Sequence, residues 1–351
     1  MKKTIIAASL TALAMGPGFV GASEHAVEGQ PITVDGKGDL SPNSEMKLIG
    51  GWHYDKNTEK NDLDHSASNT NITLTGGTFD ELIGGNHIKQ PTAGDYDLKI
   101  GNTHVTLSGE GSVTYFIGGS KANNSDKTTL ITGDVTAVIS GGSIGNQSST
   151  SEYPVSAIGG SYVKSTGNPG EGTPASTTAE TGNISLSISG GTFTGAVFGG
   201  SVADNYGEKQ AESDSTKPDL SIKTGVSSLL IEGGTFQSSD PENPKNYDFG
   251  VFGGSAALGQ KSSTESSGSS VTIEAKKVID IKGRVVGGDL LGFGGSDENA
   301  ASSKINGSTS VSITGSEKIE TSESVIGGSL LHLKLDGESS SSSISGTSSG
   351  F

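Results

Sequence analysis

The stretch SISGGTFTGAVFGGS, residues 187–201, contains the two phrases that decide the fold. In the first phrase, residues 186–193, apolar and polar residues alternate and a diglycine precedes Thr192 and Phe193. Strict alternation of Leu, Ile and Ser is typical of a β-strand with one buried face. In the second phrase, two apolar residues, Val197 and Phe198, precede the diglycine Gly199-Gly200. Together the phrases predict short strands that end at glycine corners.

Both phrases recur along the chain. The second one occurs at eight diglycines, which are Gly50-Gly51, Gly84-Gly85, Gly118-Gly119, Gly159-Gly160, Gly199-Gly200, Gly253-Gly254, Gly287-Gly288 and Gly327-Gly328. The first glycines are separated by steps of 34, 34, 41, 40, 54, 34 and 40 residues, so the core unit has about 34 residues and the longer steps carry insertions. The first phrase returns at 72–79 and 229–236, and more loosely at 105–108, 271–274 and 311–314. A third, weaker strand is expected at 97–100 and 219–222.

A repeat of this kind has too little apolar surface to fold alone, and it becomes stable when units stack strand on strand. The predicted fold is therefore all-β: a single-stranded parallel β-helix, or β-solenoid, of about eight imperfect repeats with projecting loops. We expect Phe79, Phe193 and Phe236 to form one file inside it. Glycine suits the corners because it accepts positive φ and lets successive coils approach closely.

Disorder is the alternative for a chain with only 30% hydrophobic residues and 55 glycines. Proline placement argues against it. All ten prolines lie in the first 45 residues or in insertions, and none lies inside a repeated strand phrase. Proline removes a ladder hydrogen bond, so central strands exclude it, whereas a disordered chain has no reason to do so.

The sequence divides into four parts. Residues 1–22 have the layout of a cleaved signal peptide, with Lys2 and Lys3 before an apolar segment and small residues before Ser23. Residues 23–45 are expected to lead into or cap the first coil, 46–335 to form the repeats, and 336–351, rich in Ser and Gly, to be a flexible tail. Projecting loops are expected at 146–153, 164–181, 204–218, 240–249 and 259–270.

The net charge and the absence of cysteine limit which partners and which sources of stability the chain can have. The net charge is −16, about −18 after removal of the leader, and nucleic acid would be repelled because phosphate binding needs clustered Lys and Arg. The absence of cysteine leaves an exported chain without disulfides, so stability must come from backbone hydrogen bonds and stacking.

The Gly-Gly-Thr-Phe and Val-Phe-Gly-Gly units at 187–201 resemble the repeats of large autotransporter passengers of Gram-negative bacteria, over residues 46–335. The resemblance implies a β-helical surface adhesin, carried outward through an outer-membrane translocator barrel. We expect host surface glycans or proteins as partners, and no cofactor or small-molecule substrate. No run of ten-residue amphipathic strands follows the repeats in this sequence.

The candidate chemical sites in the sequence match their motifs only in part. Gly141-Gly142-Ser143-Ile144-Gly145 matches a nucleophile elbow in letters only, because no helix signal follows Ser143. The weak calcium candidate Asp55, Asn57, Glu59 and Asn61 lacks the glycine and bidentate glutamate of a calcium loop. The six histidines are scattered without zinc-ligand spacing. We therefore expect no catalytic, cofactor-binding or metal site, and only structural glycine corners.

Three functions remain open. The first is an exported, non-enzymatic, cell-surface scaffold that presents loops for adhesion. The second is a glycan-active enzyme of the polysaccharide lyase or hydrolase kind, which Arg284, the only arginine, argues against because an anionic sugar needs cations. The third is a flat-faced binder of ice or sugar. It would need outward Thr ladders in constant register, which steps of 34 to 54 residues disfavour.

Overall fold

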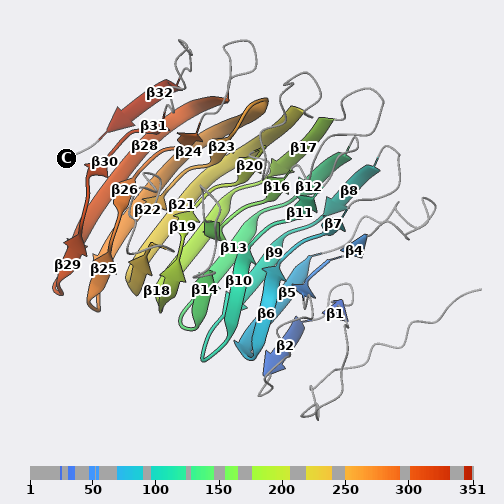
Figure 1. The fold of residues 1–351 in the computed structure, drawn as a ribbon, viewed down its shortest axis with the longest axis horizontal. Helices are drawn as coiled ribbons and strands as arrows, with labels where there is room; N and C mark the ends of the chain where they lie inside the picture. Colours follow the sequence, from blue (N-terminus) through green and yellow to red (C-terminus); the bar gives the residue numbers. More distant parts are fainter. Residues whose placement is uncertain are drawn as a thin grey trace, which may run out of the picture.

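The computed structural model describes residues 24–25, 31–35, 47–51, 53–54, 69–89, 96–123, 128–145, 155–164, 176–205, 219–238, 250–292, 301–332 and 344–349. The regular secondary structure in these ranges consists of β-strands, without a helix, which confirms the all-β class. The strands lie side by side in chain order, from the N-terminal ones at the right of Figure 1 to the C-terminal ones at the left. They form two parallel sheets.

The smaller sheet contains the eight short strands that follow the diglycines. These are β4 (His53–Tyr54), β7 (His87–Lys89), β11 (Lys121–Asn123), β16 (Tyr162–Lys164), β20 (Val202–Asp204), β23 (Ala256–Leu258), β27 (Leu290–Gly292) and β31 (Leu330–His332). Sequence analysis did not predict this strand, because three residues are too few to show an alternation.

The larger sheet contains the other 24 strands. Those that lead to the diglycines are β1 (Glu24–His25), β3 (Lys47–Ile49), β6 (Thr78–Ile83), β10 (Ser112–Ile117), β14 (Ser143–Gly145), β15 (Val155–Ile158), β19 (Ala196–Phe198), β22 (Gly250–Phe252), β25 (Ile279–Ile281), β26 (Arg284–Val286), β29 (Ile319–Thr321) and β30 (Val325–Ile326). The strands before them are β2 (Pro31–Asp35), β5 (Thr70–Gly76), β8 (Tyr96–Ile100), β9 (Thr103–Leu107), β12 (Thr128–Thr132), β13 (Val135–Ile139), β17 (Ser176–Thr181) and β18 (Ile184–Thr194). Four further strands belong to the C-terminal half: β21 (Asp219–Gln237), β24 (Ser262–Ala275), β28 (Ser302–Gly315) and β32 (Ile344–Ser349).

Every described pairing is parallel and joins equivalent residues of successive repeats. Leu82 pairs with Phe116, which pairs with Ala157, so the partners are separated by the same 34 and 41 residues as the diglycines. The ladder runs through the corners, since the Gly85 amide donates to the Gly119 carbonyl at 2.8 Å and the Gly119 amide to the Gly160 carbonyl at 2.9 Å. These long parallel sheets are consistent with a β-helix.

The apolar residues gather in separate files. One core cluster lies between the strands that lead to the diglycines and the strands before them, and includes Phe79, Phe193 and Phe236. Phe193 pairs with Phe236, and their rings stack at 4.7 Å, as predicted for this file, while Val113 and Ile144 separate Phe79 from Phe193.

The two apolar residues before each diglycine face opposite ways. Leu48 belongs to the first core cluster, whereas its neighbour Ile49 belongs to a second cluster shared with the short strands of the smaller sheet. Successive side chains of a strand point to opposite faces, so both faces of this strand are buried. Burial of both faces explains why two consecutive apolar residues precede each of these diglycines.

One predicted loop was wrong. Residues 259–270 were expected to project, but strand β24 begins at Ser262 and pairs with β21 and β28. Ser262, Thr264 and Ser266 are buried at the inward positions that apolar residues hold elsewhere. The neighbouring strands hold this polar segment in register, so its own composition does not reveal the strand. Likewise, the end of the predicted loop at 164–181 forms β17. Residues 146–153 and 240–249 lie outside the described residues.

The ends of the repeat region also carry strands. In the predicted cap, 23–45, β1 pairs with β3 and β2 with β5. In the predicted tail, 336–351, residues Ile344–Ser349 form β32, which pairs with β28. The predicted signal peptide, 1–22, lies outside the described residues.

Candidate functional site

The diglycine corners are required by close approach between successive coils. A Cβ built on the first glycine of a pair would lie within 3.0 Å of the carbonyl oxygen of the equivalent glycine in the next coil, as at Gly84, Gly118 and Gly159. The predicted need for positive φ was wrong for the eight diglycines that follow two apolar residues, which are absent from the residues with that geometry. Positive φ occurs at the other corner instead, for example at Gly77, Gly142, Gly191 and Gly234.

A ladder of side chains follows the second glycine. In each coil the next residue accepts a hydrogen bond from the backbone amide of the equivalent residue one coil earlier. The bonds run from Asn86 to Ser120 (3.1 Å), Ser120 to Ser161 (3.2 Å), Ser161 to Ser201 (3.0 Å), Ser201 to Ser255 (3.1 Å), Ser255 to Asp289 (2.8 Å) and Asp289 to Ser329 (3.0 Å). The ladder satisfies buried amides that would otherwise destabilise the corner.

Asp289 is the one acid in this ladder. Its Oδ1 accepts from the Ser255 amide, and its Oδ2 accepts from the hydroxyls of Ser303 at 2.5 Å and Thr264 at 3.3 Å. Burial raises the pKa of Asp289 to about 6, and the three hydrogen bonds only partly offset that effect. This carboxyl group therefore changes charge near neutral pH.

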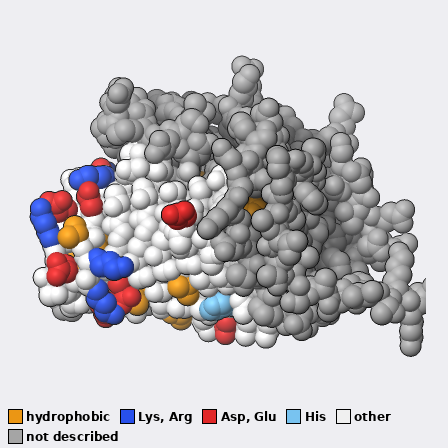
Figure 2. All heavy atoms as spheres, turned by 90° about the horizontal axis from the view of Figure 1, so that it is seen from below, with side chains coloured by type: hydrophobic (Ala, Val, Ile, Leu, Met, Phe, Trp, Pro, Cys, Tyr) orange, Lys and Arg blue, Asp and Glu red, His pale blue; other side chains and the backbone are white. Residues whose placement is uncertain are grey.

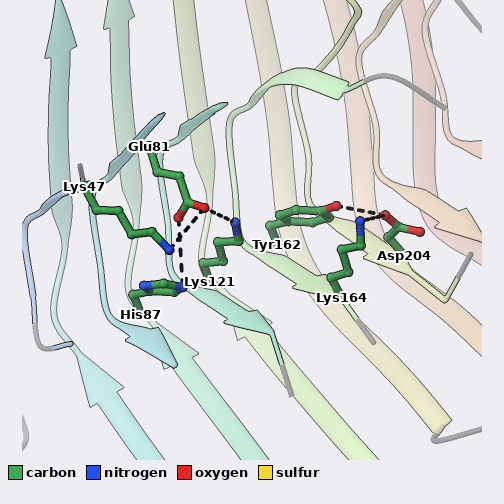
Figure 3. Close-up of polar contacts among 7 residues, drawn as sticks. All are labelled: Lys47, Glu81, His87, Lys121, Tyr162, Lys164 and Asp204. Atoms are coloured by element: carbon green, nitrogen blue, oxygen red, sulfur yellow. Dashed lines mark hydrogen bonds and ion pairs between the residues drawn. The ribbon is translucent and has the colours of Figure 1, made fainter. Parts of the chain in front are cut away.

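A buried ionic network lies in the N-terminal half, on the face of the second core cluster (Figure 3). Lys121 of β11 binds Glu81 of β6, with 2.7 Å between Nζ and Oε1. Lys47 of β3 lies 3.6 Å from the same oxygen, and Nε2 of His87 lies 3.9 Å from the other carboxylate oxygen. Three successive repeats therefore converge on one carboxylate.

The network keeps Glu81 ionised despite its burial. Burial alone would raise the pKa of the Glu81 carboxyl group, but the ammonium groups of Lys121 and Lys47 outweigh burial and lower that pKa. For Lys121, burial lowers the pKa and its attraction to Glu81 opposes that shift. The electrostatics are those of an internal ion pair that is stable only while both partners are present.

Two tyrosines extend the network toward later coils. The Lys121 ammonium lies 5.1 Å from the ring centre of Tyr115 and 5.4 Å from that of Tyr162, within cation–π range. The Tyr162 hydroxyl donates to Oδ2 of Asp204 at 2.8 Å, and Lys164 lies 3.9 Å from that oxygen. Burial, followed by the Asp204 charge, raises the pKa of Tyr162, so this hydroxyl stays a donor at neutral pH.

In this arrangement, each buried charge is compensated by a side chain from a neighbouring repeat. Its chemistry is therefore charge compensation that joins coils in register. Sequence analysis missed Glu81, Lys121 and Tyr162. A signal was available: three residues after each first glycine the sequence reads His53, His87, Lys121, Tyr162, then Val202, Ala256, Leu290 and Leu330. That column changes from polar to apolar along the stack.

The outward face of the larger sheet carries two columns of hydroxyl residues in constant register. One column is Thr129, Thr178, Ser221, Ser263 and Ser302. The other is Thr136, Ser185, Ser228, Ser270 and Ser310. Irregular repeat lengths were expected to disfavour a flat face with such columns. Each column is nevertheless in register, although the pairing of β24 with β28 shifts by one residue between the two columns.

The sequence candidates fall in different places. Asp55, Asn57, Glu59 and Asn61 lie outside the described residues. Ser143 begins the short strand β14, where an elbow serine would precede a helix. His87 is buried beside Glu81, whereas His104 lies on β9, where its ring is 3.4 Å from the Thr106 hydroxyl. In the described part of the chain, no group of three or more His, Cys, Asp or Glu residues is placed to hold a metal ion.

Comparison with protein-family models, curated proteins and solved structures found no match to this chain. A search of the described ranges for an apolar helix of membrane-spanning length found none.

Proposed function

We propose that this chain is an exported cell-surface scaffold, a β-solenoid of about eight imperfect coils that presents loops for adhesion. The observation that carries the proposal is the continuous in-register ladder through the diglycine corners. It is joined by side chains that bond backbone amides and compensate buried charges between coils. Such a column gives a rigid support for segments inserted between its strands. The resemblance to autotransporter passengers supports a surface location.

Export is tested by expressing the full sequence in a Gram-negative host. The expected result is a surface-accessible chain whose N-terminus is Ser23, found by N-terminal sequencing and by protease treatment of intact cells. Retention of the whole chain in the cytoplasm with residues 1–22 attached contradicts the proposal.

Adhesion is tested with beads that carry the purified chain, applied to epithelial cells and to a glycan array. Replacement of residues 206–217, between β20 and β21, by a Gly-Ser segment of equal length is expected to lower binding at least tenfold if this segment is the adhesive one. The matched control is the equal-length replacement of residues 165–175, between β16 and β17. Binding to no surface in the panel contradicts adhesion, and release of sugar products from polysaccharides favours the glycan-active alternative over a scaffold.

The outward hydroxyl columns favour a second candidate, a flat-faced binder of a regular surface such as ice or a crystalline polysaccharide. Neighbouring hydroxyls of one column lie about 4.8 Å apart, the spacing of paired strands. Changing Ser185 and Ser228 to lysine is expected to abolish adsorption to ice, cellulose or chitin, while the loop replacement leaves it intact. If the lysine variant still adsorbs, this candidate is excluded.

A further inference from the structure

The last described coil exposes residues that are interior in the coil before it. Ile273 is 0% exposed, whereas its pairing partner Ile313 in β28 is 42% exposed. Val285 is 0% exposed, whereas its partner Val325 in β30 is 46% exposed. These side chains are apolar like those of the core, but they are exposed because no described coil covers them.

The backbone is open at the same place. Among the described strands, β29, β30 and β31 pair only with β25, β26 and β27 of the previous coil. Strand β32 pairs with β28 from Ser303 to Ser310 and leaves Val311–Gly315 beyond its reach. An edge with unpaired amides beside exposed valine and isoleucine is a template for another chain.

The opposite end of the stack differs. Among the described strands, β1, β2 and β4 at this end also pair on one side only, but Leu48 and Ile49, in the first diglycine phrase, are 0% exposed. A head-to-tail contact would join the open end to this covered one. A contact between two open ends brings identical surfaces of the two copies together, as in the twofold interfaces of most homodimers.

Charge at the open end permits such a contact. The charged residues of β28, β29 and the turns beside them are Lys304, Glu317, Lys318, Glu320 and Glu323, two positive and three negative, so their sum is −1. Within one copy Lys304 is paired with Glu265, Lys318 with Glu320, and Glu323 with Arg284. The chain as a whole carries −16. Figure 2 shows both signs gathered at this end, with hydrophobic side chains among them. Two copies related by a twofold axis can place opposite charges face to face without strong net repulsion.

We propose that the C-terminal edge formed by residues 311–315 of β28 together with β29, β30 and β31 is a self-association surface that joins two copies of this chain end to end. The twofold axis sets the edge strands of the two copies antiparallel. The contact covers Ile313 and Val325 of both copies. Because the exposed core-type residues lie at this edge and Leu48 and Ile49 at the opposite end are buried, we expect assembly to stop at a dimer.

Sedimentation velocity and light scattering on the purified chain test the proposal. The expected mass is that of a dimer, and Val325→Lys is expected to yield a monomer because a desolvated ammonium would face its copy. Val226→Lys is the matched control: Val226 is 45% exposed, lies in the middle of the stack, and its substitution should leave the dimer intact. Circular dichroism establishes that both variants keep their β-sheet.

Single cysteines test the geometry, because the chain has none of its own. Val325→Cys should give a disulfide-linked dimer under mild oxidation and Val226→Cys should not. A monomeric wild-type chain, an unchanged dimer in Val325→Lys, or an open series of oligomers would each overturn the proposal. A monomer whose Val325→Cys thiol is protected from alkylation would show that the chain covers this edge itself.

Discussion

At the scale of single residues, Asp289 provides more than the hydrogen-bond ladder between coils requires. The ladder needs one oxygen that accepts the amide of the previous coil, and serine supplies it at Ser161, Ser201 and Ser255. Asp289 supplies the same oxygen but adds a second one, which Ser303 and Thr264 bind. The hydrogen bond from the Ser255 amide is kept, but the carboxyl group that accepts it is buried and its charge depends on pH.

The Asp289 carboxyl should make stability fall as pH rises. Its pKa is raised from 3.8 to about 6 in the folded chain, so its contribution is fully present below about pH 4 and is lost as pH rises through 6. A pKa difference of about 2 between the folded and unfolded chain corresponds to about 3 kcal/mol of stability. The free energy of unfolding of Asp289→Asn minus that of wild type should therefore increase by about 2–3 kcal/mol as the pH is raised from 4.5 to 7.5.

Urea unfolding at several pH values, followed by circular dichroism, measures this difference. All other carboxyl groups are shared by the two proteins, so they cancel in the comparison. Equal pH dependence of wild type and Asp289→Asn would show that Asp289 does not titrate in this range.

At the scale of elements, the buried ionic network joins strands that are far apart in sequence. Lys121 in β11 and Glu81 in β6 are 40 residues apart, and both are buried. Removing one partner of a buried pair leaves an uncompensated charge, whereas replacing both with apolar residues can be nearly neutral. The network therefore favours one register between successive coils, in which β6 pairs with β10 and β7 pairs with β11.

Lys121→Met should destabilise the chain by about 3 kcal/mol, since Glu81 would lose its closest cation and keep Lys47, which lies 3.6 Å away. The double change Glu81→Leu and Lys121→Met should cost less than the sum of the two single changes. A urea double-mutant cycle measures this coupling.

The matched control is Lys223→Met, which removes an exposed lysine 4.0 Å from Glu180 in the middle of the stack. Because solvent screens exposed pairs, its urea midpoint should stay at the wild-type value. Additive effects of Glu81→Leu and Lys121→Met would mean that the two side chains do not interact in solution.

At the scale of the whole molecule, the strands of each coil pair only with those of neighbouring coils among the described residues, so stability depends on position along the stack. A central coil is held on both sides, whereas the coil with β30 and β31 is held on one side among the described strands. Opening is therefore expected to begin at the ends and to spread inward.

Amide hydrogen exchange should follow this gradient in dilute protein. The Gly160 amide, bonded to the Gly200 carbonyl at 2.8 Å in the middle, should exchange at least tenfold more slowly than the Gly288 amide, bonded to the Gly328 carbonyl at 2.9 Å near the end. Mass spectrometry of peptides after timed exchange resolves the two segments. Equal protection would show that the stack opens as one unit.

The sequence by itself determined the all-β class, the positions of the corners and the file that contains Phe193 and Phe236, because these depend on a local period of two and on glycine within a few residues. Only the tertiary structure decided that residues 262–270 belong to a strand, that burial raises the pKa of Asp289 within a serine ladder and that Glu81 meets Lys121. Each of these depends on partners 14 to 42 residues away, whose register is set by stacking and leaves no local period to detect. The calcium candidate at Asp55 and its neighbours stays a prediction.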